Sequence, residues 1–406
     1  MTIASNTVRV AVISDLHAAV PEKDGTVPSY LSTAPSMNIP SRDAILALEE
    51  LIEQKQLQAD YLICCGDMAD KANPTAMNYV WGKFHLLAEK LKVKNSFATV
   101  GNHDIDSRYA YNEFDAKGML HGLNPPYPLP KKEQNYEFWT RNFVVLVEPL
   151  VRLVVLNSCA YHGVNPKPEL PEYMHGRIST RTLDDLRREL GRNHDPKSIN
   201  LLVCHHHPHK HLDIEPSDYS SMIGGEKLID LLSSVGLGSW VVIHGHKHQP
   251  RLCWGAGGAS PPLVFGAGSL SAKLYDELRD KARNQFYIIT FLLDDATELA
   301  LDIAGEVEVW DYVVGNGWSS ARIGSGLPAR AGFGYRPQLR TLARDLEGFI
   351  LTNGPIVTWK ELVSSRPGLR FLLPMDVESL RAELIRVGVK ATVDENGMLI
   401  ELVKST

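Results

Sequence analysis

The sequence is poor in the features that mark secreted, membrane-spanning or nucleic-acid-binding chains. It has only five cysteines, an odd number without the spacing of a disulfide framework, which predicts a reducing compartment. The amino terminus lacks a basic segment followed by a long apolar one, and no apolar run is long enough to span a bilayer. The net charge of −6 gives no global attraction to nucleic acid or anionic lipid. We therefore expect a cytoplasmic protein that does not bind membranes.

The composition is that of an ordinary globular protein. Hydrophobic residues make up 44% of the chain and charged residues 22%. A chain of 406 residues can bury a sizeable core, and this length suggests one large domain with a smaller one beside it. Internal repeats and low-complexity tracts are absent from the sequence.

Five short apolar runs each end in a group of polar side chains. The runs are rich in Val, Ile and Leu, as Val8–Ile13 is, and they predict buried strands. The groups that follow them are, in chain order, Asp15-Leu16-His17, Gly66-Asp67-Met68-Ala69-Asp70, Gly101-Asn102-His103-Asp104, His205-His206-His207-Pro208 and Gly245-His246-Lys247-His248. Ligands of open α/β sheets bind beyond the carboxyl ends of the strands, so all five groups can converge on one site.

The side chains in these groups suit a pair of metal ions. Carboxylate, amide and imidazole ligands without thiolate are typical of Mn, Fe, Zn or Co sites. Two such ions about 3.5–4 Å apart form the two-metal arrangement used in hydrolysis. Asn102 offers a neutral oxygen to a hard cation, His103 can donate a proton to a phosphate oxygen, and Asp104 can orient that imidazole.

Taken together, the five groups resemble the D-x-H, G-D-x-x-D, G-N-H-D, H-x-P and G-H-x-H blocks of the calcineurin-like metallophosphoesterase superfamily. The resemblance covers roughly the first three quarters of the chain. It implies a binuclear centre that hydrolyses a phosphate ester through a hydroxide between two divalent ions, with Mn²⁺ the first choice and Fe, Zn or Co as alternatives.

The resemblance also assigns roles by position. It implies that one metal is held by Asp15, His17, Asp67 and His248, and the other by Asp67, Asn102, His206 and His246. Asp67 is expected to bridge the two cations, because a carboxylate has two oxygens to share. The expected catalytic residues are His103, as proton donor, and Asp104, which would hold the tautomer of His103.

Some assignments stay open at this point. His206 is selected because the ligand in the family precedes Pro208 by two positions, yet His205 or His207 are alternatives. Asp70 stands where purple acid phosphatases carry a tyrosine ligand, and we expect it to be a turn residue or to support the metal ligands from behind. Several residues of the long loops are candidates to line the substrate pocket, namely Tyr30, Arg108, Tyr109, Tyr161 and His175.

The order of predicted elements indicates an α/β fold. Strands from both halves suggest two packed sheets flanked by helices, and the resemblance implies a four-layer α/β/β/α sandwich over residues 1–318. Residues 315–336 are glycine-rich and polar, which predicts a linker. Residues 337–406 predict a small α+β module in which helices are followed by a hairpin that turns at Asn396-Gly397, an arrangement that resembles a winged helix.

The expected activity is hydrolysis of a phosphodiester, such as a cyclic nucleotide or a related small diester. The G-D-x-x-D and G-N-H-D blocks look closest to class III cyclic-nucleotide and glycerophosphodiester phosphodiesterases. A metal-dependent nuclease of the same superfamily is the alternative, although the nearly balanced charge of the C-terminal module disfavours nucleic acid. A non-catalytic metal-binding scaffold is a third hypothesis, of a different class. For the module we expect protein contact or dimerisation.

Overall fold

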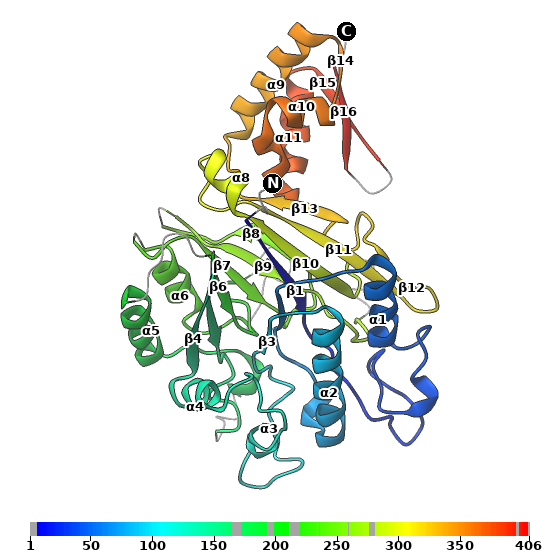
Figure 1. The fold of residues 1–406 in the computed structure, drawn as a ribbon, viewed down its shortest axis with the longest axis vertical. Coiled ribbons are helices and arrows are strands. Elements are labelled where there is room, and N and C mark those ends of the chain that lie inside the picture. Colours follow the sequence, from blue (N-terminus) through cyan, green and yellow to red (C-terminus); the bar gives the residue numbers. More distant parts are fainter. Residues whose placement is uncertain are drawn as a thin grey trace, which may run out of the picture.

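The computed structural model describes residues 6–164, 172–192, 199–210, 220–234, 236–258, 260–275, 281–394 and 398–404. Two mixed β-sheets pack face to face, with helices on both outer faces (Figure 1). The predicted four-layer α/β/β/α sandwich with a small C-terminal module is thereby confirmed. Among the described residues, no helix is both long and apolar enough to cross a bilayer.

The first sheet is built around β1 (Thr7–Ile13), which lies in its interior. On one side it pairs in parallel with β2 (Tyr61–Cys64), which in turn pairs in parallel with β3 (Asn95–Ala98). On the other side it pairs antiparallel with β10 (Gln285–Leu292), and the sheet continues through β11 (Gly305–Val313) to β12 (Gly317–Ser320) and β13 (Arg330–Phe333). Amino-terminal and late segments are thus joined in one sheet.

Two helices connect the parallel strands of the first sheet and cover its outer face. They are α1 (Ala44–Lys55) and α2 (Pro74–Lys90). The side chain of Asp43 caps α1 by accepting from the backbone N–H groups of Ile45 and Leu46, both at 2.9 Å. Asn73 caps α2 in the same way. Such caps satisfy backbone N–H groups that the first turn of a helix leaves without a partner. Each helix therefore begins directly after its capping residue.

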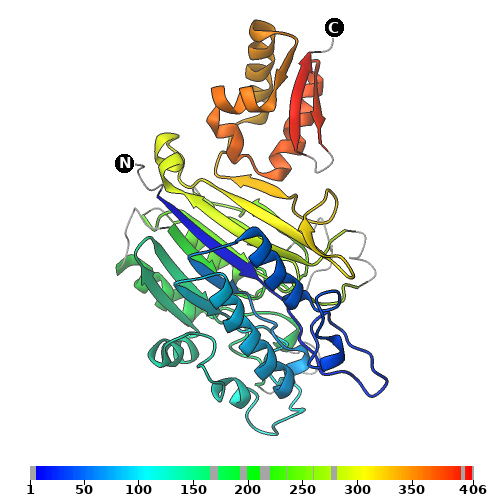
Figure 2. The ribbon, with the colours of Figure 1, turned by 45° about the vertical axis from the view of Figure 1, so that its right-hand side comes forward.

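The second sheet has the order β4-β5-β6-β7-β9-β8. Its first two strands form the hairpin predicted from the sequence, and its central strands run parallel. The bounds are β4 (Phe143–Glu148), β5 (Val151–Leu156), β6 (Ile199–Val203), β7 (Trp240–His244), β8 (Arg251–Trp254) and β9 (Leu263–Gly266). Helices α5 (Thr180–Arg192) and α6 (Gly225–Leu232) cover its outer face (Figures 1 and 2).

Alternating side chains of the second sheet divide between two hydrophobic cores. Leu153 and Val155 of β5 belong to the core between the sheets, whereas Val154 and Leu156 belong to the core beneath α5 and α6. Successive residues of a strand point to opposite faces, so a strand buried on both sides is apolar throughout. This explains the continuous apolar runs in the sequence and fixes the sheets in the middle of the sandwich.

Short elements occupy the connections. They are α3 (Gly118–His121), α4 (Lys132–Arg141), α8 (Leu293–Glu298) and the 3-10 helices η1 (Pro35–Met37), η2 (Asp70–Ala72) and η3 (Glu172–Met174). The expected linker at residues 315–336 differs from the structure, because it contains β12 and β13, which both pair with β11. The first sheet therefore extends beyond residue 318.

The C-terminal module has a hydrophobic core of its own, formed by side chains such as Leu346 and Leu402. It contains α9 (Leu339–Asn353), β14 (Ile356–Thr358), α10 (Trp359–Ser365), η4 (Pro367–Phe371), α11 (Pro374–Arg386), β15 (Val389–Val393) and β16 (Leu399–Lys404). The expected strands pair antiparallel, while the predicted turn residues Asn396-Gly397 lie outside the described residues. The boundaries at 318 and 337, and the division into two domains, stay predictions.

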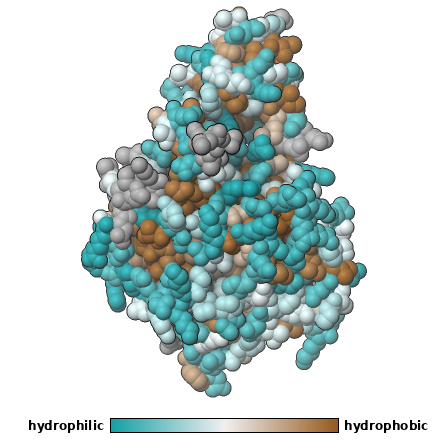
Figure 3. Space-filling model, in the orientation of Figure 1, coloured by the Kyte–Doolittle hydropathy of each residue, from teal (hydrophilic) through white to brown (hydrophobic). Residues whose placement is uncertain are grey.

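The module rests on the first sheet near β13 and α8 (Figures 1 and 2). Its Arg370 donates two hydrogen bonds to the carboxylate of Glu306 on β11, at 2.6 and 3.0 Å. The cation of Arg336 lies 4.7 Å from the ring centre of Trp254 on β8. The surface in this view is largely hydrophilic, with apolar residues scattered over the module and the sandwich alike (Figure 3).

The separate core of the module generates a stability prediction. Leu346→Ala, which removes a fully buried side chain, is expected to lower the free energy of unfolding of the module by roughly 2–5 kcal/mol. The matched control is Leu351→Ala on the same helix, where the side chain is 67% exposed and the change is expected to stay within about 0.5 kcal/mol. Denaturant unfolding followed by intrinsic fluorescence measures both. Equal losses in the two variants contradict the assigned core.

Candidate metal centre

The polar groups that follow the five strands meet at one end of the sandwich, in backbone conformations that side chains rarely adopt. Five of the residues there have positive φ: Asp15 (51°), His17 (47°), Asp67 (53°), His246 (77°) and His248 (54°). Non-glycine residues in this region carry strain, which persists only where the surrounding structure holds it. Such strain gathers at functional sites, and here it coincides with the predicted metal ligands.

The first predicted ligand set is brought together. Nε2 of His17 lies 3.2 Å from Nε2 of His248 and 3.6 Å from Oδ2 of Asp67. Nε2 of His248 lies 3.3 Å from Oδ1 of Asp15. All four side chains are buried, although they belong to β1, β2 and β7 connections far apart in the sequence. Asp15, His17, Asp67 and His248 thus offer two imidazoles and two carboxylates to one point.

The second set gathers on the other side of Asp67. Oδ1 of Asn102 lies 2.9 Å from Nε2 of His205 and 3.1 Å from Nδ1 of His246. The two imidazole nitrogens are 3.2 Å apart, and Nε2 of His205 lies 3.4 Å from Oδ2 of Asp67. The same oxygen of Asp67 therefore faces both groups of side chains.

The geometry favours His205 over His206 as the ligand from the loop after β6. Nδ1 of His205 lies 2.8 Å from the carbonyl oxygen of Cys65, which directs its Nε2 toward Asn102 and Asp67. Metal-binding histidines commonly use the second ring nitrogen in this way. Nδ1 of His206 lies 2.9 Å from the hydroxyl of Ser158 and 3.8 Å from the thiol of Cys159, but no hydrogen bond within the described residues joins its Nε2 to Asn102 or Asp67. The side chains of adjacent residues project in different directions, so only His205 of these two faces Asn102 and Asp67.

The electrostatics of the cluster fit bound cations. Burial opposes the charge of Asp67, but His205 and His103 hold the pKa of this carboxyl well below its usual range. Burial likewise opposes a charged His205, yet the adjacent carboxylate of Asp67 raises the pKa of His205 to about 9. The buried carboxylates of Asp15 and Asp67 thus favour positive charge in the site, because a buried charge is stable only beside an opposite charge. The oxygen and imidazole donors are those that divalent transition metals accept.

Asp104 has other partners than the expected one. Its carboxylate accepts hydrogen bonds from the backbone N–H groups of Asp67, Met68, Ala69 and Gly101, at 3.0, 2.7, 3.2 and 2.8 Å. Burial and the charge of Asp67 raise the pKa of Asp104 to about 6. It therefore joins the two loops that carry Asp67 and Asn102, whereas its expected role of orienting His103 has no counterpart among the hydrogen bonds of the described residues.

The group beside His103 is Asp70. Its Oδ1 lies 3.2 Å from Nδ1 of His103 and 3.9 Å from Nδ1 of His17. Asp70 therefore supports two imidazoles of the site from behind, which agrees with the role expected of it. The sequence signal that could have assigned it to His103 is the second aspartate of Gly66-Asp67-Met68-Ala69-Asp70, three positions beyond the bridging carboxylate.

Three contacts of the site have no signal in the sequence. Ser14 donates from its hydroxyl to Oδ2 of Asp15 at 2.5 Å, and the backbone N–H of His246 donates to the same carboxylate. Gly66 and Gly101 lie so close together that a Cβ on either would collide with backbone of the other loop or with Asp67. The ligands are therefore held by backbone as well as by side chains.

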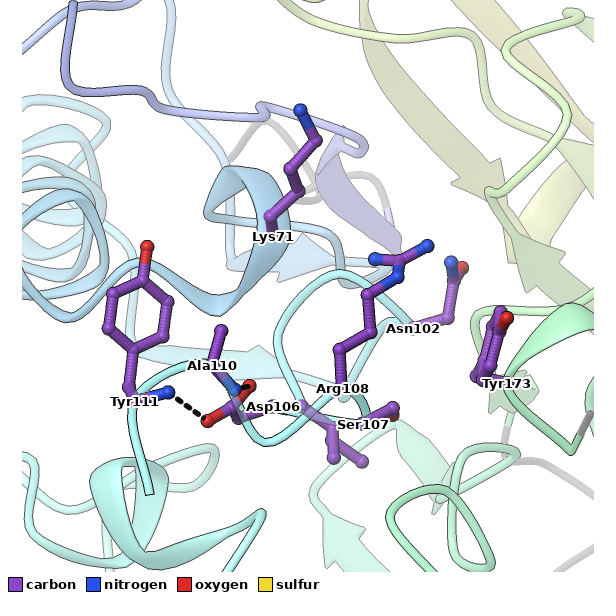
Figure 4. A pocket seen from close by; sticks show the side chains of 9 residues that line it. Lys71, Asn102, Asp106, Ser107, Arg108, Ala110, Tyr111 and Tyr173 are labelled. Atoms are coloured by element: carbon purple, nitrogen blue, oxygen red, sulfur yellow. Dashed lines mark hydrogen bonds between the residues drawn. The ribbon is translucent and has the colours of Figure 1, made fainter. Parts of the chain in front are cut away.

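A cavity of about 310 Å³ lies beside Asn102. Of the loop residues proposed to line a pocket, Arg108 does so, together with Lys71, Ile105, Asp106, Ser107, Ala110, Tyr111 and Tyr173 (Figure 4). Tyr30 and His175 have other surroundings: Tyr30 packs against Tyr312, and His175 is buried against Glu172. Tyr109 donates a hydrogen bond to the carbonyl oxygen of Gly163.

Comparison with known proteins decides the family. A family model described as calcineurin-like phosphoesterase matches residues 8–250, which include every residue of both ligand groups. The chain belongs to this family. It is accordingly a metallophosphoesterase, a hydrolase of phosphate esters. A second model, a winged helix-turn-helix domain associated with calcineurin-like proteins, matches residues 331–385.

Several solved structures are similar to this metallophosphoesterase. A dimetal phosphatase from Danio rerio is 14% identical, with a TM-score of 0.44 over 69% of this chain and 95% of that one. A purple acid phosphatase from yellow lupin seeds is 13% identical, with a TM-score of 0.47 over 77% and 52%. A Haemophilus influenzae NAD nucleotidase is 13% identical, with a TM-score of 0.34 over 71% and 48%. No curated protein matches the sequence.

The contacts of the two adjacent histidines generate a prediction about metal content. His205→Ala is expected to cost the protein at least one of two bound divalent ions, because it removes an imidazole that faces Asn102 and Asp67. His206→Ala is expected to keep both ions. Elemental analysis after reconstitution with Mn²⁺ and desalting measures the difference, with circular dichroism to confirm that both variants fold. Loss of metal from His206→Ala alone would restore the assignment made from the sequence.

Proposed function

We propose that this metallophosphoesterase hydrolyses small phosphodiesters with two divalent ions. One ion is held by Asp15, His17, Asp67 and His248. The other is held by Asp67, Asn102, His205 and His246. The observation that carries the proposal is the position of the Asp67 carboxylate, whose Oδ2 lies 3.6 Å from His17 and 3.4 Å from His205. Such a pair of ions supplies Lewis acidity and a water made acidic enough to attack phosphorus at neutral pH.

The proposed proton donor is His103. Its Nδ1 lies against Asp70, which leaves Nε2 as the nitrogen that can give a proton to the leaving oxygen. The side chain is 28% exposed, whereas the ligand His205 is fully buried, so His103 is accessible to a substrate from the outside. Burial acts to lower the pKa of His103, but the carboxylates of Asp67 and Asp70 raise it overall, which favours the protonated, donating form.

The preference for a diester and for manganese belongs to the proposal. The G-D-x-x-D and G-N-H-D blocks, which look closest to class III cyclic-nucleotide and glycerophosphodiester phosphodiesterases, support a small diester. Ligands of oxygen and imidazole without thiolate support Mn²⁺, with Fe, Zn or Co as alternatives. All five cysteines are buried and none of them forms a disulfide within the described residues, which supports the predicted reducing, cytoplasmic compartment.

A nuclease activity is the second candidate, favoured by the winged helix-turn-helix model over residues 331–385. Several basic side chains of the module are already paired with acidic ones. The pairs are Arg366 with Asp345, Arg370 with Glu306, Arg381 with Glu378, Arg386 with Glu383 and Lys404 with Glu347. Neutralised cations contribute little to phosphate-backbone binding. We therefore rank protein contact or dimerisation above nucleic-acid binding for the module.

The role of His103 generates a prediction about turnover. His103→Asn is expected to lower kcat on bis(p-nitrophenyl) phosphate by roughly 10²–10⁴-fold with Mn²⁺ present, because it removes the proton donor, while both metal ions stay bound. The matched control is His121→Asn, since the ring of His121 packs on Trp139, outside the centre. Steady-state kinetics and metal analysis measure the two effects separately.

The same assay ranks the substrates. Cyclic AMP, p-nitrophenyl phosphate and single-stranded DNA are compared under one metal condition, and the diester cyclic AMP is expected to be cleaved in preference to the monoester and the DNA. Preferential cleavage of DNA would replace the proposal with the nuclease. Failure of the Mn²⁺-loaded protein to cleave bis(p-nitrophenyl) phosphate contradicts the proposed diesterase.

A further inference from the structure

The cavity beside Asn102 is larger than a reacting phosphate requires. Its volume of about 310 Å³ lies at the lower end of the range for small-molecule sites. Ile105, Tyr111 and Tyr173 contribute apolar and aromatic wall, and Arg108 reaches into the same space (Figure 4). Because Asn102 belongs to both the cavity and the metal centre, a substrate whose phosphate lies at the ions can extend into this cavity.

The loop that carries Arg108 is held in place before any substrate arrives. The buried carboxylate of Asp106 accepts from the backbone N–H groups of Ala110, Tyr111 and Asn112, at 2.7, 2.7 and 3.0 Å. The hydroxyl of Tyr111 accepts from Nδ2 of Asn73 at 3.0 Å, which connects the loop to the start of α2. Such preorganisation reduces the conformational entropy that the loop loses when a substrate binds.

The cation of Arg108 is not neutralised within the described part of the chain. No carboxylate there lies within ion-pair distance of its guanidinium, which stacks 5.1 Å from the ring centre of Tyr173 instead. The carboxylate of Asp106, in the same loop, accepts from three backbone donors. Lys71 adds a second cation at the cavity, 63% exposed and 3.7 Å from Asp70. A guanidinium placed in this way can bind a phosphate through two parallel hydrogen bonds.

We propose that this cavity binds a second phosphate group of the substrate, with Arg108 as the residue that recognises it. The preferred substrate is then a phosphodiester whose non-reacting part carries a phosphate of its own. This inference rests on the proposed function, because the ester must lie at the metal centre for its other end to reach Arg108.

The test uses two substrates that differ by one phosphate and release the same coloured product, p-nitrophenol. These are thymidine 5′-(p-nitrophenyl phosphate) and its 3′-phosphorylated form, both assayed with the Mn²⁺-loaded full chain. The wild type is expected to show a higher kcat/KM for the 3′-phosphorylated form, on the order of 10- to 100-fold, because a charge-assisted hydrogen bond to phosphate is made only there. The increase in kcat/KM is expected to come from a lower KM, and it is expected to shrink as the salt concentration is raised.

Two variants at the proposed site and one elsewhere complete the design. Arg108→Gln is expected to reduce the ratio of the two kcat/KM values to about one, since it removes the cation. Arg108→Lys, which keeps the charge but not the planar fork, is expected to retain part of the ratio. The control Arg181→Gln lies on α5, where the side chain is 86% exposed, and is expected to keep the whole ratio.

The possible outcomes distinguish a failure of the second phosphate site from a failure of the proposed diesterase function. A wild type that cleaves both esters with equal kcat/KM overturns the phosphate site and leaves the diesterase standing. A ratio that survives in Arg108→Gln overturns the role of Arg108. A metal-loaded wild type that cleaves neither ester overturns the proposed function and this inference with it.

Discussion

The candidate site depends on the burial of the Asp67 carboxylate between two groups of proposed metal ligands. A buried carboxylate is costly unless opposite charge and hydrogen bonds surround it. Here Oδ2 faces His17 and His205, while Oδ1 accepts from the backbone N–H of His103 at 2.7 Å. One side chain therefore sets the separation of the two groups and the position of the proposed proton donor. The remaining features of the site keep this carboxylate where it is.

The surrounding framework is made of backbone as much as of side chains. Asp104 joins the loops after β2 and β3 through four backbone donors, and the close approach of Gly66 and Gly101 leaves no room for a Cβ. Positive φ at the strand ends aims the ligands inward at a cost of about 1–3 kcal/mol for each strained residue. Metal binding can offset that cost, since a ligand that binds only the folded state stabilises it. Stability and activity are thereby linked through the same few residues.

Much of the fold was predictable because its strands are buried on both faces. Continuous apolar runs such as Leu201–Val203 identify strands, and the polar groups after them mark the edge at which the ligands meet. The sequence could not reveal that β12 and β13 extend the first sheet, because short, glycine-containing edge strands such as Gly317–Ser320 have the composition of a loop. Local composition carries no information on which distant strand a segment pairs with.

The differences between the expected and the observed surroundings of the site residues have a similar origin. Spacing from Pro208 favoured His206, but the direction of each imidazole depends on partners elsewhere in the chain: the Cys65 carbonyl for His205 and the Ser158 hydroxyl for His206. Asp104 adjoins His103 in sequence, yet its carboxylate faces the backbone of another loop, and Asp70 takes the place beside the imidazole. Residue type and order indicate which groups meet, whereas their pairing follows from the path of the backbone.

We propose that two cations lie on either side of Asp67. Anomalous diffraction from crystals of the full chain grown with Mn²⁺, recorded near the manganese absorption edge, tests it most directly. We expect two peaks about 3.5–4 Å apart, one toward His17 and His248 and the other toward Asn102 and His205, both within coordination distance of the Asp67 carboxylate. A single peak, or two peaks that do not share Asp67, would contradict it.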